Sequence, residues 1–200
     1  MKSKLWWAVL GSVLVFTGAA VAQDKKPPEV RRIVTGLDAS GKAIIMFDSA
    51  MSLTSFRSPN PAGEMWVTPS SPPDYSWTDD RAKIKVPLVP PDGGTIFRIV
   101  DFVPLNPDAA KKMDINLMMK VVGDHAPKKG QPPKHPMMHR TRSLDYAIIM
   151  SGEIDMMMDD KIVHLKAGDV VVQQATNHAW INRGTEVCRI AFILMDGKEP

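Results

Sequence analysis

The chain has 200 residues, of which 44% are hydrophobic and 24% charged, and its formal net charge is +3. This length is enough for one domain with a substantial core. The weak positive charge comes with no basic patch interleaved with aromatic residues, so we expect no nucleic-acid partner.

The N-terminus has the three parts of an export signal. Residues 1–4 are basic, residues 5–18 are apolar, and Ala20-Val21-Ala22 is a small-residue cleavage site. We therefore predict that residues 1–22 are a signal peptide and that the mature chain, which begins at Gln23, is periplasmic or secreted. The apolar stretch could instead be retained as an anchor, but no charged stop follows it. We expect no stable membrane span after cleavage.

Cys188 is the only cysteine, so an exported chain has no internal disulfide and depends on its core for stability. It lies in the strand-like run 187–194, where burial is the ordinary interpretation and a catalytic thiol is the alternative.

Strand-like runs follow in chain order. The first two are joined across Gly36 to Gly41 and predict a hairpin. A proline-rich segment, Ser58 to Asp92, is expected to be mostly irregular, a feature typical of a lid, a binding loop or an oligomer contact; a homodimer is one arrangement it allows. The run 115–122 is compatible with a strand or a helix. The predicted strands before this point are 30–35, 42–47, 64–68 and 95–102.

The most informative stretch runs from His139 to Asn182 and has two strand-turn-strand halves. Alternation along a strand places His139 and Thr141 on one face, and it likewise groups His178 with Trp180. If the two halves pack as opposed sheets, His139, Asp145 and His178 converge in one cavity. Two imidazoles and a carboxylate are the ligands of a facial triad, which suits iron(II), with manganese or zinc as alternatives.

This stretch resembles the two-motif core of the cupin superfamily. His139 matches the first histidine of the family pattern, Asp145 stands at its glutamate, and the second motif retains a histidine followed four residues later by an asparagine. Pro133 replaces the opening glycine and Thr141 replaces a second histidine, so three of the usual four ligands remain. The first motif is similar to a His-Arg-Thr subgroup of small bacterial proteins and fungal biosynthetic oxidoreductases. The other matching residues are Gly152, Gly168, His178 and Asn182.

The resemblance implies an all-β fold, a double-stranded β-helix or cupin jelly-roll barrel with an N-terminal β extension. We predict one cupin domain over residues 23–200, with the barrel core at about 115–197.

Each candidate ligand also has an ordinary structural explanation. His178 could be a satisfied core histidine and His139 a surface residue of the preceding proline-rich link. Asp145 could pair with Arg140 or Arg142. His135 is a weaker substitute ligand, and His164 is expected to point outward. Tyr146 is expected to face the opposite side of the strand from Asp145 and to lie in the core.

Two functional classes follow. The first is a metal-dependent enzyme, an oxidoreductase or a related catalyst, that acts on a small organic molecule, with metal held by His139, Asp145 and His178 and a substrate pocket that includes Thr141 and Trp180. The second is a non-catalytic module that binds a small molecule or a metal without turnover, because this fold hosts both. The residues do not identify a catalytic acid, base or nucleophile.

Overall fold

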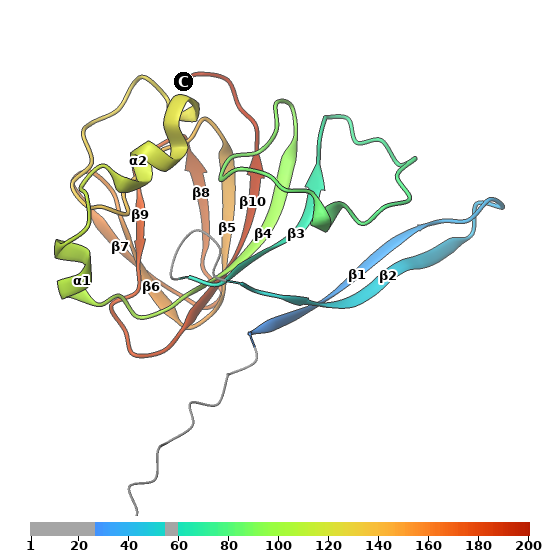
Figure 1. Ribbon diagram of the computed structural model, residues 1–200, viewed down its shortest axis with the longest axis horizontal. Coiled ribbons are helices and arrows are strands. Elements are labelled where there is room, and N and C mark those ends of the chain that lie inside the picture. Colours follow the sequence, from blue (N-terminus) through green and yellow to red (C-terminus); the bar gives the residue numbers. More distant parts are fainter. Residues whose placement is uncertain (1–26, 55–59) are drawn as a thin grey trace, which may run out of the picture.

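Strands dominate the part of the chain that the computed structural model describes, residues 27–54 and 60–200, and these strands form three sheets (Figure 1). The predicted signal peptide lies outside these ranges, and the extent of the domain from residue 23 stays a prediction. The five-stranded sheet has the order β3 (Ala62–Thr68), β4 (Thr95–Phe102), β10 (Cys188–Met195), β5 (Leu144–Ser151) and β8 (Val170–Gln174). The three-stranded sheet has the order β7 (Ile162–Lys166), β6 (Glu153–Met157) and β9 (Ala179–Ile181), and β1 (Glu29–Leu37) pairs with β2 (Ala43–Ser52).

The two larger sheets face each other across the main hydrophobic core. The five-stranded sheet contributes Ile96, Ile149 and Phe192, and the three-stranded sheet contributes Ile154 and Trp180. Alternate residues of β5 point into this core, which is why its burial alternates along the strand. This two-layer arrangement confirms the predicted all-β jelly-roll fold.

Each strand-turn-strand half of the stretch from His139 to Asn182 contributes one strand to each of the two larger sheets. In the first half β5 joins the five-stranded sheet and β6 the three-stranded sheet, and β8 and β9 divide in the same way. The two halves therefore interleave between the two sheets, and the arrangement considered above, with each half forming one of two opposed sheets, is not the one in the structure. Turns with Gly152 and Gly168 in positive-φ conformations allow the chain to pass between strands.

Helices are short and lie in the connection between β4 and β5. They are α1 (Pro107–Lys111), α2 (Leu117–Val122) and the one-turn 3-10 helix η2 (Gly123–His125). The Asn106 side chain caps α1 by accepting hydrogen bonds from two backbone amides. Of the two readings left open for 115–122, helix is the correct one: unbranched leucine and methionine side chains lose little rotamer freedom in a helix. Within the described ranges, no helix is long and apolar enough to cross a membrane.

The proline-rich segment is mostly irregular where it is described, residues 60–92. Its regular elements are β3 and the 3-10 helix η1 (Arg81–Lys83), as predicted. Val86 from this segment enters the main core. The side chain of Arg98, inside the five-stranded sheet, donates to the carbonyl oxygens of Pro87 and Leu88 at 3.2 and 3.0 Å and pairs with Glu64 at 2.7 Å. These contacts hold the irregular segment against the core.

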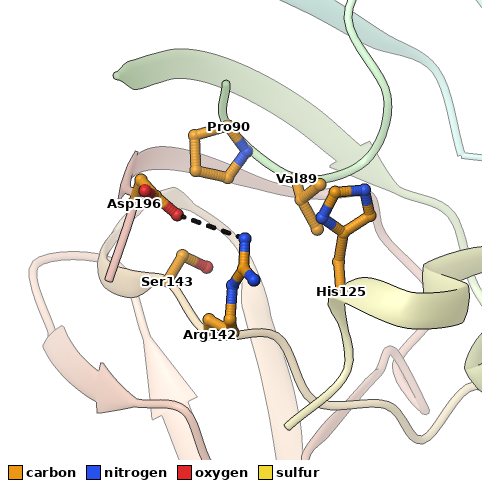
Figure 2. A pocket seen from close by; sticks show the side chains of 6 residues that line it. All are labelled: Val89, Pro90, His125, Arg142, Ser143 and Asp196. Atoms are coloured by element: carbon orange, nitrogen blue, oxygen red, sulfur yellow. Dashed lines mark ion pairs between the residues drawn. The ribbon is translucent and has the colours of Figure 1, made fainter. Parts of the chain in front are cut away.

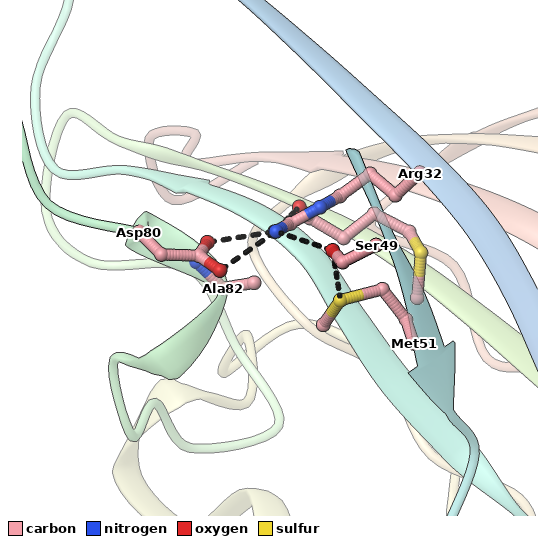
Figure 3. Close-up of polar contacts among 6 residues, drawn as sticks. Arg32, Ser49, Met51, Asp80 and Ala82 are labelled. Carbon is pink, nitrogen blue, oxygen red and sulfur yellow. Dashed lines mark hydrogen bonds and ion pairs between the residues drawn. The ribbon is translucent and has the colours of Figure 1, made fainter. Parts of the chain in front are cut away.

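The β1–β2 hairpin is a separate ribbon whose root is fixed to the rest of the molecule. We predicted an N-terminal extension of the barrel sheets; β3 provides one, but β1 and β2 form their own sheet. The buried Arg32 makes two 2.7 Å hydrogen bonds to Asp80 and a third, at 3.0 Å, to the carbonyl oxygen of Met65 (Figure 3). Charge-assisted, bidentate geometry of this kind is strong and directional. The root of the ribbon therefore has a defined orientation.

Candidate functional site

His139 and His178 lie side by side because an isolated antiparallel bridge joins them. The backbone amide of each residue donates to the carbonyl oxygen of the other, at 2.9 Å in both directions. Such a hydrogen-bonded antiparallel pair places its two side chains on the same face. The ring centroids are accordingly 4.4 Å apart, with an interplanar angle of 52°. The structure thus brings together two of the three predicted ligands, although they are 39 positions apart in the sequence.

Both imidazoles are held in the same tautomer by matching hydrogen bonds. His139 Nδ1 lies 3.0 Å from the carbonyl oxygen of Met137, and His178 Nδ1 lies 3.0 Å from that of Thr176. Because a carbonyl oxygen can only accept, each Nδ1 carries the proton and each Nε2 presents a lone pair. This outer hydrogen bond is the usual way in which a protein orients a metal-ligating histidine.

The same environment keeps both rings neutral. Burial, with the neighbouring His139 as a second cause, lowers the pKa of His178 to about 3. Burial also lowers the pKa of His139. A metal ligand must be a neutral imidazole, so these two residues are in the required protonation state without any proton loss near neutral pH.

Asp145 is a buried carboxyl group that is only partly satisfied. Gln173 Nε2 donates to its Oδ2 at 3.1 Å, whereas Oδ1 has no hydrogen-bond partner among the described residues. Burial raises the pKa of Asp145 to about 6, against the smaller opposing effects of the Ser143 hydroxyl and the Arg98 charge. The predicted alternative pairing with Arg140 or Arg142 is not what the structure has. A buried oxygen of this kind is completed by a proton or a cation.

Two buried polar side chains precede Asp145 in the segment that leads into its strand. Thr141, Ser143 and Asp145 alternate with outward-facing neighbours, and the Thr141 and Ser143 hydroxyl oxygens are 2.7 Å apart. Sequence reasoning identified Thr141 but missed Ser143 and Gln173. The alternation was a usable signal for Ser143, whereas Gln173 depends on the pairing register of β5 with β8.

Aromatic side chains form the apolar side of the site. The Trp180 ring makes an edge contact with His178, with centroids 6.1 Å apart, and packs on Phe192 at 5.5 Å. Trp180 is 8% exposed and Thr141 is 2% exposed, so both predicted pocket residues are buried beside the candidate ligands. The Asn182 side chain donates to the carbonyl oxygens of Phe102 and Glu186, which makes it a structural tie between strands.

The three predicted ligands are not assembled as a ready metal centre. Within residues 27–54 and 60–200, no group of three or more histidine, cysteine, aspartate or glutamate side chains is placed to hold a metal ion. The two histidines form a pair, and Asp145 lies on a different strand. The three-ligand site therefore stays a prediction. Of the other histidines, His164 points outward and contacts Asp155 at 2.9 Å, as expected for a surface residue.

A small pocket lies beside the irregular segment and the start of β5 (Figure 2). Ser143, one of the two buried polar residues that precede Asp145, lines it. Arg142 lies opposite Asp196 at 3.8 Å and also 3.5 Å from Asp92, while His125 of η2 closes another side. Ser143, two positions before Asp145, connects the pocket lining to the buried carboxyl group's segment.

The two facing sheets enclose the histidine pair, and residues 125–194 of this part of the chain match the family model described as Cupin domain. The predicted resemblance is thus confirmed for this part of the chain.

Individual relatives extend the likeness over most of the chain. Phomopsin biosynthesis cluster protein C' from Diaporthe leptostromiformis is 29% identical over 191 residues, covering 90% of this chain and 86% of that protein. The cupin-domain-containing oxidoreductase srdD of Neurospora crassa is 28% identical over 180 residues, covering 86% and 77% of the two chains. The crystal structure of a Cupin 2 conserved barrel domain protein from Salinispora arenicola covers 72% of this chain and 82% of that one, with 14% identity and a TM-score of 0.38.

Proposed function

We propose that this chain is a metal-dependent oxidoreductase that acts on a small organic molecule. The observation that carries the proposal is the His139–His178 pair: two adjacent neutral imidazoles, each with its Nδ1 proton tied to a carbonyl oxygen and its Nε2 lone pair free. Similarity over 86% of this chain to a cupin-domain-containing oxidoreductase supports the reaction class.

The donor chemistry fits a divalent metal. His139 and His178 would supply nitrogen through Nε2, and the unsatisfied Oδ1 of Asp145 would supply oxygen. Two nitrogens and one carboxylate suit iron(II), with manganese or zinc as alternatives. When bound, such a metal would polarise a carbonyl or enol group of the substrate or activate oxygen.

The surrounding residues would prepare the site for that chemistry. Asp145, with its pKa raised to about 6 by burial, must lose its proton to act as a ligand, and near neutral pH little free energy is needed for this. Trp180 and its aromatic neighbours exclude water from one side of the histidine pair. The Thr141 and Ser143 hydroxyl groups can orient a polar group of the substrate beside them.

Metal analysis of the natively processed protein tests the proposal. We expect the wild type to bind close to one equivalent of iron(II) on anaerobic titration, and His139→Ala and His178→Ala to lose it while their circular dichroism stays unchanged. His164→Ala is the matched control, because this histidine is 60% exposed on β7 and should leave metal content unaltered. Each comparison uses the same buffer and metal concentration.

A non-catalytic binding module is the second candidate, and the lack of a ready three-ligand group in the described ranges is the observation that favours it. If the wild type takes up no more metal than His139→Ala and His178→Ala, the enzyme proposal loses its mechanism. The histidine pair, of which His178 is buried and His139 half-buried, and the aromatic side chains beside it would then be interpreted as a binding pocket for an organic ligand.

A further inference from the structure

The hairpin of β1 and β2, residues 29–52, extends away from the two facing sheets as a projecting arm (Figure 1). Its outer half carries apolar side chains in solvent: Leu37 is 71% exposed, Ile45 61% and Ile33 49%. An isolated two-stranded ribbon is at best marginally stable in water. Exposed apolar side chains on such a ribbon indicate a surface that is covered in the working form of the protein.

A second exposed apolar surface lies on the outer face of the five-stranded sheet. We call this surface the outer patch. Val170 is 62% exposed, Val172 57% and Met150 48%, and β8, which carries both valines, is an edge strand of the sheet. The members of the outer patch are Phe97, Tyr146, Ile148, Met150, Val170 and Val172. Tyr146 faces away from Asp145 as predicted, but it belongs to this exposed face and not to the core.

The outer patch and the arm account for 10 of the 16 large hydrophobic residues that are exposed in the described part of the chain. The exposed apolar side chains are therefore concentrated on two surfaces. Apolar residues scattered singly over a surface are ordinary, whereas concentrated ones indicate a contact surface.

The root of the arm already shows what it packs against. Val30 and Met51 lie on Met65, Ile99 and Ala191, which belong to this same outer sheet face. Strand pairing aligns Ile99 and Ala191 with Ile148 in one cross-strand row, and β8 continues that row. One half of the row is thus buried under the arm root and the other half is exposed.

We propose that the outer half of the arm packs on the outer patch of a second copy of this chain, so that two copies exchange arms in a two-fold symmetric dimer. The arm of each copy would continue, on its partner, the apolar layer that the partner's own arm root begins. A two-fold arrangement satisfies both surfaces of both copies at once, and it closes without leaving an unpaired patch.

The exposed surface is large enough for a stable dimer. Adjacent strand residues point to opposite faces, so the arm presents Ile33, Leu37 and Ile45 together and Ile44 on its other face. These three side chains and the six of the outer patch are about half exposed. If each contributes roughly 80 Å², they supply ~700 Å² per copy, close to the share that a standard interface takes from each partner. The ion pair between Arg32 and Asp80 fixes the direction of the arm, so little conformational freedom is lost on association.

Sedimentation velocity of the natively processed protein tests the proposal. We expect a dimer for the wild type. Ile45→Lys in the arm and Val172→Lys in the outer patch should each weaken the dimer by roughly a hundredfold or more, since symmetry introduces each buried charge twice. Ile162→Lys is the matched control, because Ile162 is 51% exposed on β7, outside both surfaces, and it should stay dimeric. Val172→Thr provides a milder variant that keeps the β preference of the strand.

A mixing experiment identifies which surfaces meet. The Ile45→Lys chain retains an intact patch and the Val172→Lys chain an intact arm, so a mixture of the two should form a heterodimer through one remaining contact although neither chain dimerises alone. Dimers that depend on Val172 but not on Ile45 would show that the patches meet each other and would overturn the arm exchange. A mixture that stays monomeric would overturn it as well, because one intact contact between arm and patch would remain in the heterodimer. A monomeric wild type would also overturn it.

Discussion

Replacing Asp145 with asparagine should raise the free energy of unfolding of the metal-free protein relative to that of wild type by more at pH 8 than at pH 4. Burial raises the pKa of Asp145 from 3.8 to about 6. A group whose pKa is raised on folding stabilises the fold below its unfolded pKa and loses that contribution as pH rises through the folded value. One pKa unit corresponds to about 1.4 kcal/mol, so ionisation of Asp145 costs the wild type ~3 kcal/mol above pH 6, and asparagine avoids this cost.

The measurement is urea unfolding of both proteins from pH 4 to pH 8 in the presence of a chelator. The free energy of unfolding of Asp145→Asn minus that of wild type should increase by ~2–3 kcal/mol over this range. The pH dependence of His178 is common to both proteins and cancels in the difference. Asp160→Asn, at a side chain that is 85% exposed, is the control and should give a flat line.

A flat difference for Asp145→Asn would refute the reasoning, because it would mean that the carboxyl group is ionised in the fold at no cost. Addition of saturating metal provides a second readout. If Asp145 is a ligand, the wild type gains about 2.7 kcal/mol at a metal concentration of 100 times Kd, and asparagine should lose most of that gain.

Three further predictions concern the metal, a turn and the N-terminus. Metal affinity should fall as pH drops below about 6, where Asp145 takes up a proton, whereas His178, with a pKa of about 3, stays neutral over this range. Isothermal titration at pH 5 and pH 7 checks this, and in Asp145→Asn the affinity should change much less between the two. Gly152→Ala should destabilise more than Gly168→Ala in urea unfolding: both have positive φ, which costs ~1 kcal/mol, but a Cβ at Gly152 would lie 2.6 Å from the carbonyl oxygen of Val187, and at Gly168 it would meet nothing within 4 Å. Mass spectrometry of the exported protein should find Gln23 at its N-terminus, and full-length chain in the membrane fraction would contradict export with cleavage.

The fold could be predicted from the sequence where local patterns decide the structure. The length and β-forming residues of the run 145–150, and the Ser151-Gly152 turn after it, predict β5 correctly, but they do not say which face is buried, because its outward residues are as apolar as its inward ones. The pattern of the run 115–122 fits a strand or a helix, and the choice between them depends on contacts with neighbouring segments that the sequence does not reveal. The separate arm could not be foreseen either, because a hairpin pattern does not say whether a third strand will pair with it.

For the candidate site, the sequence predicts which two histidines lie together but not the groups that hydrogen-bond to them. The positions of His139 and His178 follow from the family motif, and their shared bridge brings them together. The partners that hold them, carbonyl oxygens two residues earlier in the chain, depend on backbone direction and leave no trace in residue type. Gln173 as the partner of Asp145 required the register between two strands that are 28 positions apart at this pair.

The single cysteine makes the arm exchange directly observable. Cys188 is completely buried in the main core, and burial raises the pKa of its thiol to about 11, so at pH 7 only roughly one thiol in ten thousand is ionised and reactive. A maleimide reagent should leave the folded wild type unlabelled. Lys42→Cys, at an exposed position by the turn of the arm and outside the apolar contact, would then carry the sole reactive thiol, and a spin label there would report the distance between the two arms without any other cysteine being removed.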